Sequence, residues 1–89
     1  MPQIIVKYLL WLRDKASTDK DVFIFQSEIT LKELVDKIME KRPTLRKFLA
    51  NIFDKNNNII ILINGKTGKK DQILRTNDIV SIIPPVSGG

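Results

Sequence analysis

The segment Thr30–Lys41 reads TLKELVDKIMEK and predicts a helix with one buried face. The Thr30 hydroxyl can accept a hydrogen bond from the Glu33 amide, while the Glu33 carboxylate reaches back to the Thr30 amide, which forms a capping box. Apolar residues then recur at the i, i+3, i+4, i+7 and i+8 spacing of a buried helix face. They are Leu31, Leu34, Val35, Ile38 and Met39. Pro43 ends the helix, because the residue before a proline is pushed out of the helical region.

Runs of apolar and β-branched residues on both sides of this helix predict strands. The candidate strands are Ile4–Leu12, Val22–Phe25, Ile59–Ile63 and Ile79–Ile83. A shorter helical segment is expected at Leu45–Ile52, and Asn64-Gly65 is expected to form a tight turn. We therefore predict an α+β fold in which the main helix and the second short helix pack on a mixed sheet of four to five strands. The first and last strands would be parallel and adjacent at the centre of that sheet.

The chain has 89 residues, enough for one domain, and it contains neither cysteine nor histidine. Without cysteine there is no thiolate nucleophile, no persulfide and no Cys-ligated metal. Without histidine the commonest general base and the commonest transition-metal ligand are missing. We therefore expect no enzyme, no bound metal and no bound cofactor, but a chain whose partners supply the catalytic groups.

The formal net charge of +5 permits an acidic partner. No run of basic residues exceeds two, so we favour the simpler explanation, that scattered lysines keep a small protein in solution. The same two explanations apply to Lys66–Lys70, which is expected to be a basic loop. The apolar segment Ile4–Leu12 is too short to span a membrane and has no basic stretch before it, so we expect a cytoplasmic protein.

The sequence changes character after the last predicted strand. Pro84 and Pro85 have no amide hydrogen to donate, so they end strand pairing and hold a stiff, extended exit. The tail that follows, Val86-Ser87-Gly88-Gly89, would reach about 13 Å when extended, at about 3.3 Å per residue. We therefore divide the chain into a globular domain at residues 1–85 and a flexible tail at residues 86–89.

The carboxylate of Gly89 is the candidate reacting group. A carboxylate is a poor electrophile, but an acyl-adenylate carries a good leaving group, and a sulfur or amine nucleophile can then form a thiocarboxylate or an amide. Because the carboxylate itself reacts, the chain needs neither histidine nor cysteine. Gly88 is the second candidate residue, since a side chain there would collide with the walls of a narrow tunnel in a partner.

Strand alternation predicts which residues lie on the sheet face away from the main helix. Lys7 marks that face on the first strand, which places Ile5, Leu9 and Trp11 beside it and turns Leu10 and Leu12 toward the helix. An exposed apolar patch beside a reactive tail is typical of a docking surface. We assign to this surface Ile5, Leu9, Ile60, Leu62 and Ile83. The alternative is that Leu45–Ile52, or a second copy of the chain, covers the face.

The ending DIVSIIPPVSGG, residues 78–89, closely resembles the C-terminus of the MoaD-type sulfur carriers. These are the small subunits of molybdopterin synthase, in the ubiquitin-like β-grasp superfamily. The resemblance covers nearly the whole chain. Supporting similarities lie at Val6-Lys7-Tyr8, the pair Leu12-Arg13, Thr30-x-x-Glu33-Leu34 with Pro43, and Ile63-Asn64-Gly65-Lys66. The chain departs from the family at Ala16-Ser17-Thr18, where a Gly is often found, and at Asn56–Asn58, where a Gly is also usual.

The resemblance implies a carrier that works with two partners. A ubiquitin-activating-type enzyme would adenylate Gly89 with ATP and install sulfur as a thiocarboxylate. The large subunit of molybdopterin synthase would then receive the tail, and the sulfur would pass to a pterin precursor of the molybdenum or tungsten cofactor. ATP and the pterin would occupy the partners' sites. Arg13 would either pair with a partner carboxylate or cap its own loop.

Other functions fit parts of the sequence. A ubiquitin-like modifier of lysines, or a sulfur carrier for tRNA thiolation, would use the same tail chemistry up to the last step. A basic β-grasp module that binds nucleic acid would need basic and aromatic residues gathered on one face, whereas the lysines here are scattered.

Overall fold

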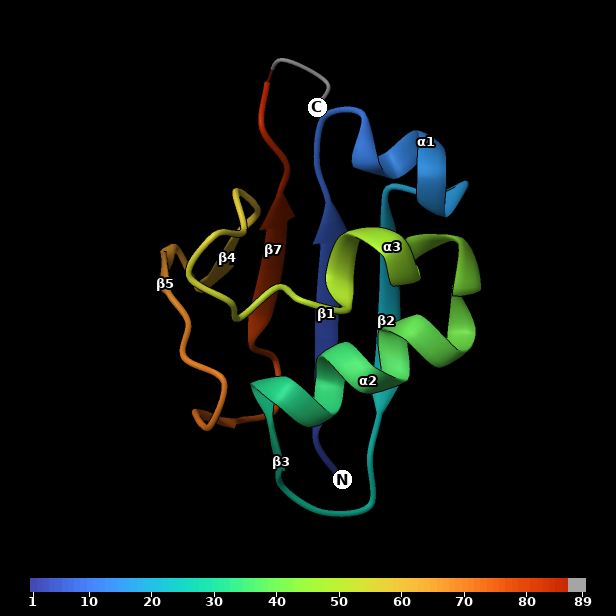
Figure 1. Ribbon diagram of the computed structural model, residues 1–89. Coiled ribbons are helices and arrows are strands. Elements are labelled where there is room, and N and C mark those ends of the chain that lie inside the picture. Colours follow the sequence, from blue (N-terminus) through green and yellow to red (C-terminus); the bar gives the residue numbers. More distant parts are fainter. Residues whose placement is uncertain (87–89) are drawn as a thin grey trace.

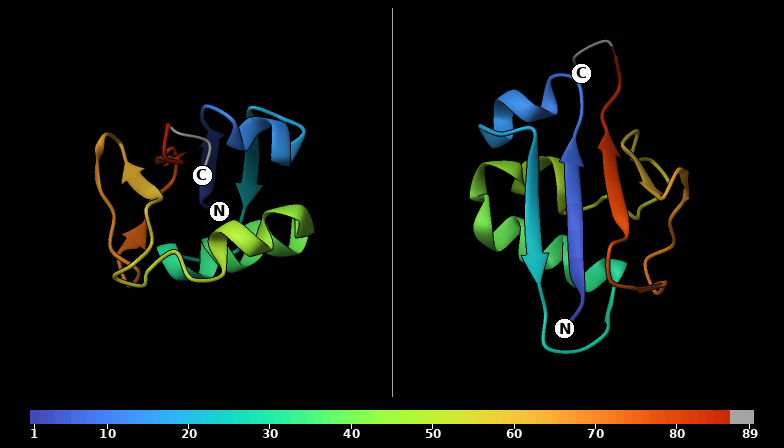
Figure 2. Two further views of the ribbon diagram at one scale, coloured as in Figure 1. Left: turned by 45° about the horizontal axis from the view of Figure 1, so that its top comes forward. Right: turned by 180° about the vertical axis from the view of Figure 1, so that it is seen from behind.

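The structure is a computed structural model that describes residues 1–86. Its main layer is a mixed five-stranded sheet with the strand order β2-β1-β7-β4-β5, and helices cover one face of that sheet (Figures 1 and 2). The strands are β1 (Gln3–Tyr8), β2 (Lys20–Ile24), β4 (Ile60–Ile63), β5 (Lys66–Thr67) and β7 (Ile79–Ile83). The predicted α+β fold and its number of strands are confirmed.

The first and last strands, β1 and β7, lie side by side at the centre and run parallel, as predicted. Val6 is opposite Val80, and Tyr8 is opposite Ile82. Each of the two strands pairs antiparallel on its other side, β1 with β2 and β7 with β4. The inward side chains of this central pair are buried and form the floor of the core.

The main helix α2 (Leu31–Lys41) forms where the sequence predicts it. The Glu33 amide donates to Thr30 Oγ1 at 3.2 Å, and the Thr30 amide donates to Glu33 Oε1 at 2.9 Å, so both halves of the capping box are present. Four of the five residues of the predicted stripe are buried, and Met39 is half-buried. The helix therefore covers the central strands with the predicted face.

The second helical segment is shorter than predicted. It consists of a 3₁₀ turn (Pro43–Leu45) and the single-turn helix α3 (Arg46–Leu49), and irregular turns follow where the prediction continued to Ile52. Figure 2 shows α3 on the same side of the sheet as α2. The segment thus deepens the core, where Leu45 and Leu49 are buried, and leaves the opposite sheet face uncovered.

The structure contradicts the prediction after Tyr8. Leu10 has φ 53°, which turns the chain, and the next residues form the helix α1 (Leu12–Ala16) instead of continuing the strand. Leu10 is exposed rather than turned toward the helix, and Trp11 contacts Phe48 of α3 rather than sharing the Lys7 face. Both predicted orientations are wrong, because an apolar stretch without Gly, Pro, Asn or Asp gives no sign of a turn.

Short strands that the sequence did not predict lie at the β5 edge of the main sheet and in a second, two-stranded sheet. Asn64 and Gly65 both have positive φ, 51° and 84°, as a tight hairpin turn requires, so that turn is confirmed. The expected basic loop then begins with strand β5, and a small separate sheet joins β3 (Ile29–Thr30) to β6 (Ile73–Leu74). Two-residue strands are too short to show a period in the sequence.

No helix within residues 1–86 has the length and apolarity needed to cross a membrane.

Candidate functional site

The predicted tail leaves the sheet at the end of β7. We call the described residues of this exit, Pro84–Val86, the tail root. Pairing ends at Ile83, and the next three residues pass quickly from the core to the surface: Pro84 is buried, Pro85 is half-buried and Val86 is 86% exposed. The candidate residues Ser87, Gly88 and Gly89 lie outside the described residues, so their predicted roles stay predictions. The structure therefore describes the tail root but not the three residues after it.

Trp11 contacts the tail root. Its Nε1 donates a hydrogen bond of 2.7 Å to the Pro85 carbonyl oxygen, and its ring meets the Phe48 ring edge-on with 5.2 Å between centroids. Sequence reasoning missed this contact, because it continued the first strand to Leu12 and placed Trp11 on the Lys7 face. Tyr8 lies opposite Ile82, but the chain turns at Leu10, so strand register alone does not bring Trp11 to Pro85.

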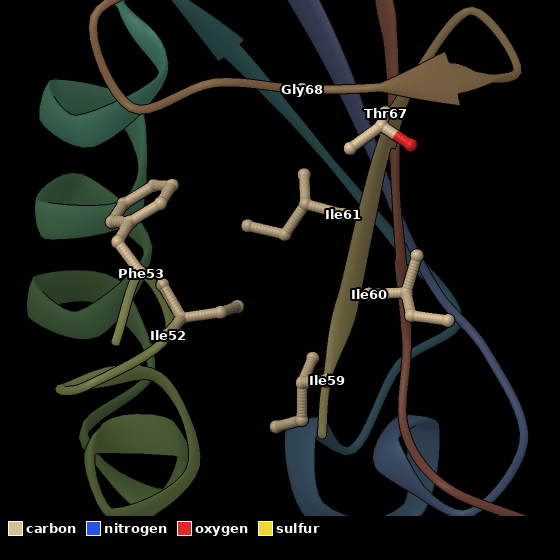
Figure 3. Close-up of a pocket in the computed structure, with 7 residues that line it drawn as sticks. All are labelled: Ile52, Phe53, Ile59, Ile60, Ile61, Thr67 and Gly68. Atoms are coloured by element: carbon tan, nitrogen blue, oxygen red, sulfur yellow. The ribbon is translucent and has the colours of Figure 1, made fainter. Parts of the chain in front are cut away.

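A cavity of about 300 Å³ opens beside the tail root. Its walls include Trp11, Phe48, Ile59 and Pro85, and Lys47 and the turn at Asn56–Asn58 complete the lining. A larger cavity of about 400 Å³ lies between β4 and the turn after α3. Figure 3 shows Ile59 and Ile61 directed toward Ile52 and Phe53 across it, whereas Ile60 points to the other side of β4. None of the residues that line this larger cavity carries a charge.

The sheet face opposite the helices carries the predicted docking residues. Ile60 is 51% exposed, and Ile5, Leu9, Leu62 and Ile83 are half-buried. Ile60 lies opposite Ile83 in the β4–β7 pair, and the Leu9 amide donates to the Ile82 carbonyl at 3.1 Å, which places Leu9 next to Ile83. Leu62 follows Ile60 by two residues on the same face of β4 and lies opposite Ser81. Leu9, Ile60, Leu62 and Ile83 therefore form one group, which we call the tail-proximal cluster.

Ile5 does not belong to this cluster. It lies opposite Ile79 of β7 and Val22 of β2, nearer the start of the central strands. Lys7 and Ser81, which face each other across the central pair, stand between it and the tail-proximal cluster. Alternation had identified the correct face for Ile5, but it cannot tell how far along that face a residue lies.

The basic candidates are exposed but are not drawn into the site. Arg13 lies on α1, and its backbone carbonyl accepts hydrogen bonds from the Ser17 and Thr18 amides, which close the end of that helix. The lysines at positions 66, 69 and 70 are exposed on and after β5, at one edge of the sheet. Their roles toward a partner stay predictions.

A buried polar group lies on the helix side of the sheet. Asp21, which is 6% exposed, accepts a hydrogen bond of 2.7 Å from the Tyr8 hydroxyl and two from the Arg42 guanidinium, at 2.8 and 2.7 Å. The Arg42 hydrogen bonds hold the pKa of Asp21 below its ordinary value, and burial together with Asp21 raises the pKa of Tyr8 far above its ordinary value. The three side chains hydrogen-bond to one another and so join β1, β2 and the end of α2. Sequence reasoning missed them because the predicted strand began at Val22, so Asp21 lay outside it, whereas β2 begins at Lys20.

Comparison with known proteins gives a consistent match. The model of the ThiS family matches residues 6–89. A Pyrococcus furiosus protein with the provisional name molybdopterin converting factor, subunit 1, has a TM-score of 0.84 and 22% identity, with 97% of this chain and 100% of that chain covered. The small archaeal modifier protein 1 of Methanosarcina acetivorans has a TM-score of 0.74 and 28% identity, with 100% and 98% covered.

A third similar structure is a complex. It holds subunits 1 and 2 of molybdopterin-converting factor from Helicobacter pylori, and the match has a TM-score of 0.64 and 20% identity, with 98% of this chain and 99% of that chain covered. The three structures confirm the predicted ubiquitin-like β-grasp fold.

Proposed function

The chain belongs to the ThiS family of small ubiquitin-like β-grasp carriers, and on that premise we propose that it is the sulfur carrier of molybdopterin synthase. In this proposal the chain is the small subunit of that enzyme. The carboxylate of Gly89 is adenylated, becomes a thiocarboxylate and then donates its sulfur in molybdenum cofactor biosynthesis. The carrier works in the cytoplasm.

The observation that carries the proposal is the position of the tail root. Pro84 and Pro85 leave the sheet at the end where the tail-proximal cluster lies, so a partner that covers this cluster also meets the start of the tail. A carrier needs this arrangement, because its docking contacts must position a reacting group that it presents but does not itself activate. Apolar residues on an uncovered sheet face supply the docking contact, and the tail supplies the reacting group.

The chemistry requires two partners. A ubiquitin-activating-type enzyme binds ATP and joins AMP to the Gly89 carboxylate with release of pyrophosphate, and a sulfur nucleophile then displaces AMP. The large synthase subunit holds the pterin precursor and receives the tail. The Helicobacter pylori complex supports the second partnership, since it pairs subunit 1 with subunit 2 of molybdopterin-converting factor. ATP and the pterin belong to the partners' sites.

Intact-protein mass spectrometry tests the proposal. With ATP, the activating enzyme and a sulfur donor, the chain should gain about 16 Da, the mass by which sulfur exceeds oxygen, and no cysteine could hold that sulfur as a persulfide. Oxidation of Met1 or Met39 adds nearly the same mass, so fragmentation must assign the gain to the C-terminal peptide. An added residue after Gly89, deletion of Gly89, or Gly88→Val should abolish the gain. A gain elsewhere in the chain, or in the extended variant, contradicts the proposal.

A second candidate is a ubiquitin-like protein modifier. The 28% identity with the small archaeal modifier protein 1, over the whole of this chain, favours it. A carrier for tRNA thiolation would share the same activation. Affinity purification from the native cell separates these functions: a stable complex with a large synthase subunit supports the first proposal. Isopeptide bonds between Gly89 and lysines of many proteins support the modifier.

A further inference from the structure

The backbone at the tail root has little rotational freedom before the tail begins. Peptide bonds are planar, so each residue contributes only the two soft angles φ and ψ. The rings of Pro84 and Pro85 fix both φ angles near −65°. Pro84 is also buried, so packing holds it in place. The ψ angle of Pro85 is therefore the first rotation that can redirect the tail.

Trp11 restrains this rotation. The Pro85 carbonyl oxygen, which accepts the 2.7 Å hydrogen bond from Trp11 Nε1, belongs to the same planar unit as the Val86 nitrogen. An oxygen that is held in place therefore also fixes the direction in which the chain continues. Val86 is 86% exposed, so side-chain packing beyond Pro85 adds little restraint.

The donor is itself held from two sides. Its ring packs edge-on against Phe48 of α3, at 66° between the ring planes. On its other side Trp11 leads directly into α1, whose Leu12 and Ala16 are buried in the core. Because the donor is already fixed, closing this hydrogen bond costs only the ψ freedom of Pro85, so we expect the contact to stay closed for most of the time.

We propose that Trp11 is a positioning residue that fixes the direction in which the C-terminal tail leaves the globule. The inference rests on the proposed function, because direction matters only if a partner takes up the tail. A tail that points one way enters a partner's tunnel without a search. A tail released at Pro85 points the right way for only a fraction of the time. The apparent affinity of the carrier for its partner is then the full affinity multiplied by that fraction.

Two variants isolate the hydrogen bond. Trp11→Phe keeps an aromatic ring against Phe48 and removes the N–H donor. Because Trp11 is the single tryptophan of the chain, a benzothiophene analogue of tryptophan can also be incorporated there, with sulfur in place of the N–H. Thr44→Val is the matched control, since it removes a side-chain-to-backbone hydrogen bond of 2.8 Å, from Thr44 Oγ1 to the Lys15 carbonyl, away from the tail. Thermal unfolding verifies that all three variants fold.

The first measurement is nuclear magnetic resonance of the free carrier. We expect slow deuterium exchange of the Trp11 indole N–H in the wild type. We also expect a Val86 amide order parameter that falls to a flexible value, below about 0.6, in Trp11→Phe and in the analogue but not in Thr44→Val. Fast indole exchange, or a Val86 amide equally mobile in the wild type and in Trp11→Phe, overturns the proposal without reference to any partner.

The second measurement is ATP–pyrophosphate exchange by the activating enzyme, with the carrier as the varied substrate. Trp11→Phe should raise KM roughly 3- to 10-fold, as expected for one neutral hydrogen bond, and leave kcat within about twofold. Thr44→Val should change neither constant. An unchanged or lowered KM in Trp11→Phe overturns the positioning role. If the wild type supports no exchange at all, the proposed function fails, and the resonance measurement still decides whether Trp11 restrains the tail.

Discussion

Arg42, directly after α2, grips the carboxylate of Asp21 on β2 with two hydrogen bonds, from Nε to Oδ2 and from Nη2 to Oδ1. The Tyr8 hydroxyl completes the contact from β1. Arg42 also donates to the Ala16 carbonyl at 3.2 Å, so one guanidinium joins the end of α2, the edge strand and the end of α1. Planar bidentate pairs of this kind are among the stronger hydrogen bonds in proteins.

Asp21→Asn should make the stability of the protein less dependent on acid pH. The Arg42 hydrogen bonds lower the pKa of Asp21 in the folded state. The Asp21 charge therefore stabilises the fold fully when the pH is above the pKa of Asp in the unfolded chain, about 3.9. That stability is lost as pH falls through the folded pKa. Urea denaturation at pH 7 should show Asp21→Asn less stable by about 1.5–3 kcal/mol. At pH 2–3 the difference should shrink, and an equal difference at both pH values would contradict the assignment.

Leu34→Ala should test the packing of α2 on the sheet. Leu34 is fully buried, so its truncation should lower the free energy of unfolding by about 2–5 kcal/mol in a denaturant melt. Lys37→Ala, on the exposed side of the same helix, is the control and should change stability by no more than about 0.5 kcal/mol. A loss below about 0.5 kcal/mol for Leu34→Ala would mean that this helix face is not in the core.

Ile60→Asp should weaken binding to both proposed partners while the fold survives. Ile60 is 51% exposed in the tail-proximal cluster, so a charge there meets solvent in the free carrier but an apolar surface in a complex. We expect at least a roughly tenfold rise in Kd, measured by titration calorimetry. Leu9 and Ile83 are less suitable for this test, because they are half-buried and a charge there would also disturb packing.

Ile24→Asp is the matched control for that experiment. Ile24 is 62% exposed on the same sheet face, but it lies on the edge strand β2, far along the face from the tail-proximal cluster. It should bind both partners like the wild type. Loss of binding in Ile24→Asp with normal binding in Ile60→Asp would move the docking surface to the other end of the sheet.

Gly68→Ala should destabilise the globule through steric crowding. A Cβ at this position would lie 2.8 Å from Leu31 Cδ2 and 2.9 Å from Ile63 Cδ1, inside contact distance of two buried side chains. We expect a loss of about 1–3 kcal/mol in urea denaturation. Gly68→Ser should cost at least as much, and a neutral result for both variants would show that the segment after β5 does not press on the core.

The helix and the strands could be predicted because their signals are local. The capping box at Thr30 and Glu33 and the apolar stripe of α2 lie within twelve consecutive residues, and each predicts the same element. The parallel central pair, which joins residues far apart in the sequence, was expected from the predicted mixed sheet and is confirmed. The end of β1 could not be predicted, because the turn at Leu10 rests on a positive φ in a residue type that rarely adopts one.

The site was only partly predictable for a related reason. Alternation assigns a residue to a face, so it placed Ile60 correctly on the open side, but position along the face depends on register between distant strands. Register separates Ile5 from the other four docking residues. Asp21 and Arg42 are 21 residues apart in the sequence, so no local pattern indicates that they are in contact.

The pairing of β1 with β7 also determines when this protein can fold. Val6 and Val80 are separated by 74 residues, so the centre of the sheet closes only when nearly all of the chain is available. Closing so large a loop costs entropy before any central contact forms, which makes folding slow compared with helical proteins of this size. A nascent chain that is interrupted before Ile79–Ile83 lacks a central strand, so we expect it to remain unfolded and open to proteases. The strand from which the tail emerges is therefore also a strand that the centre of the sheet requires.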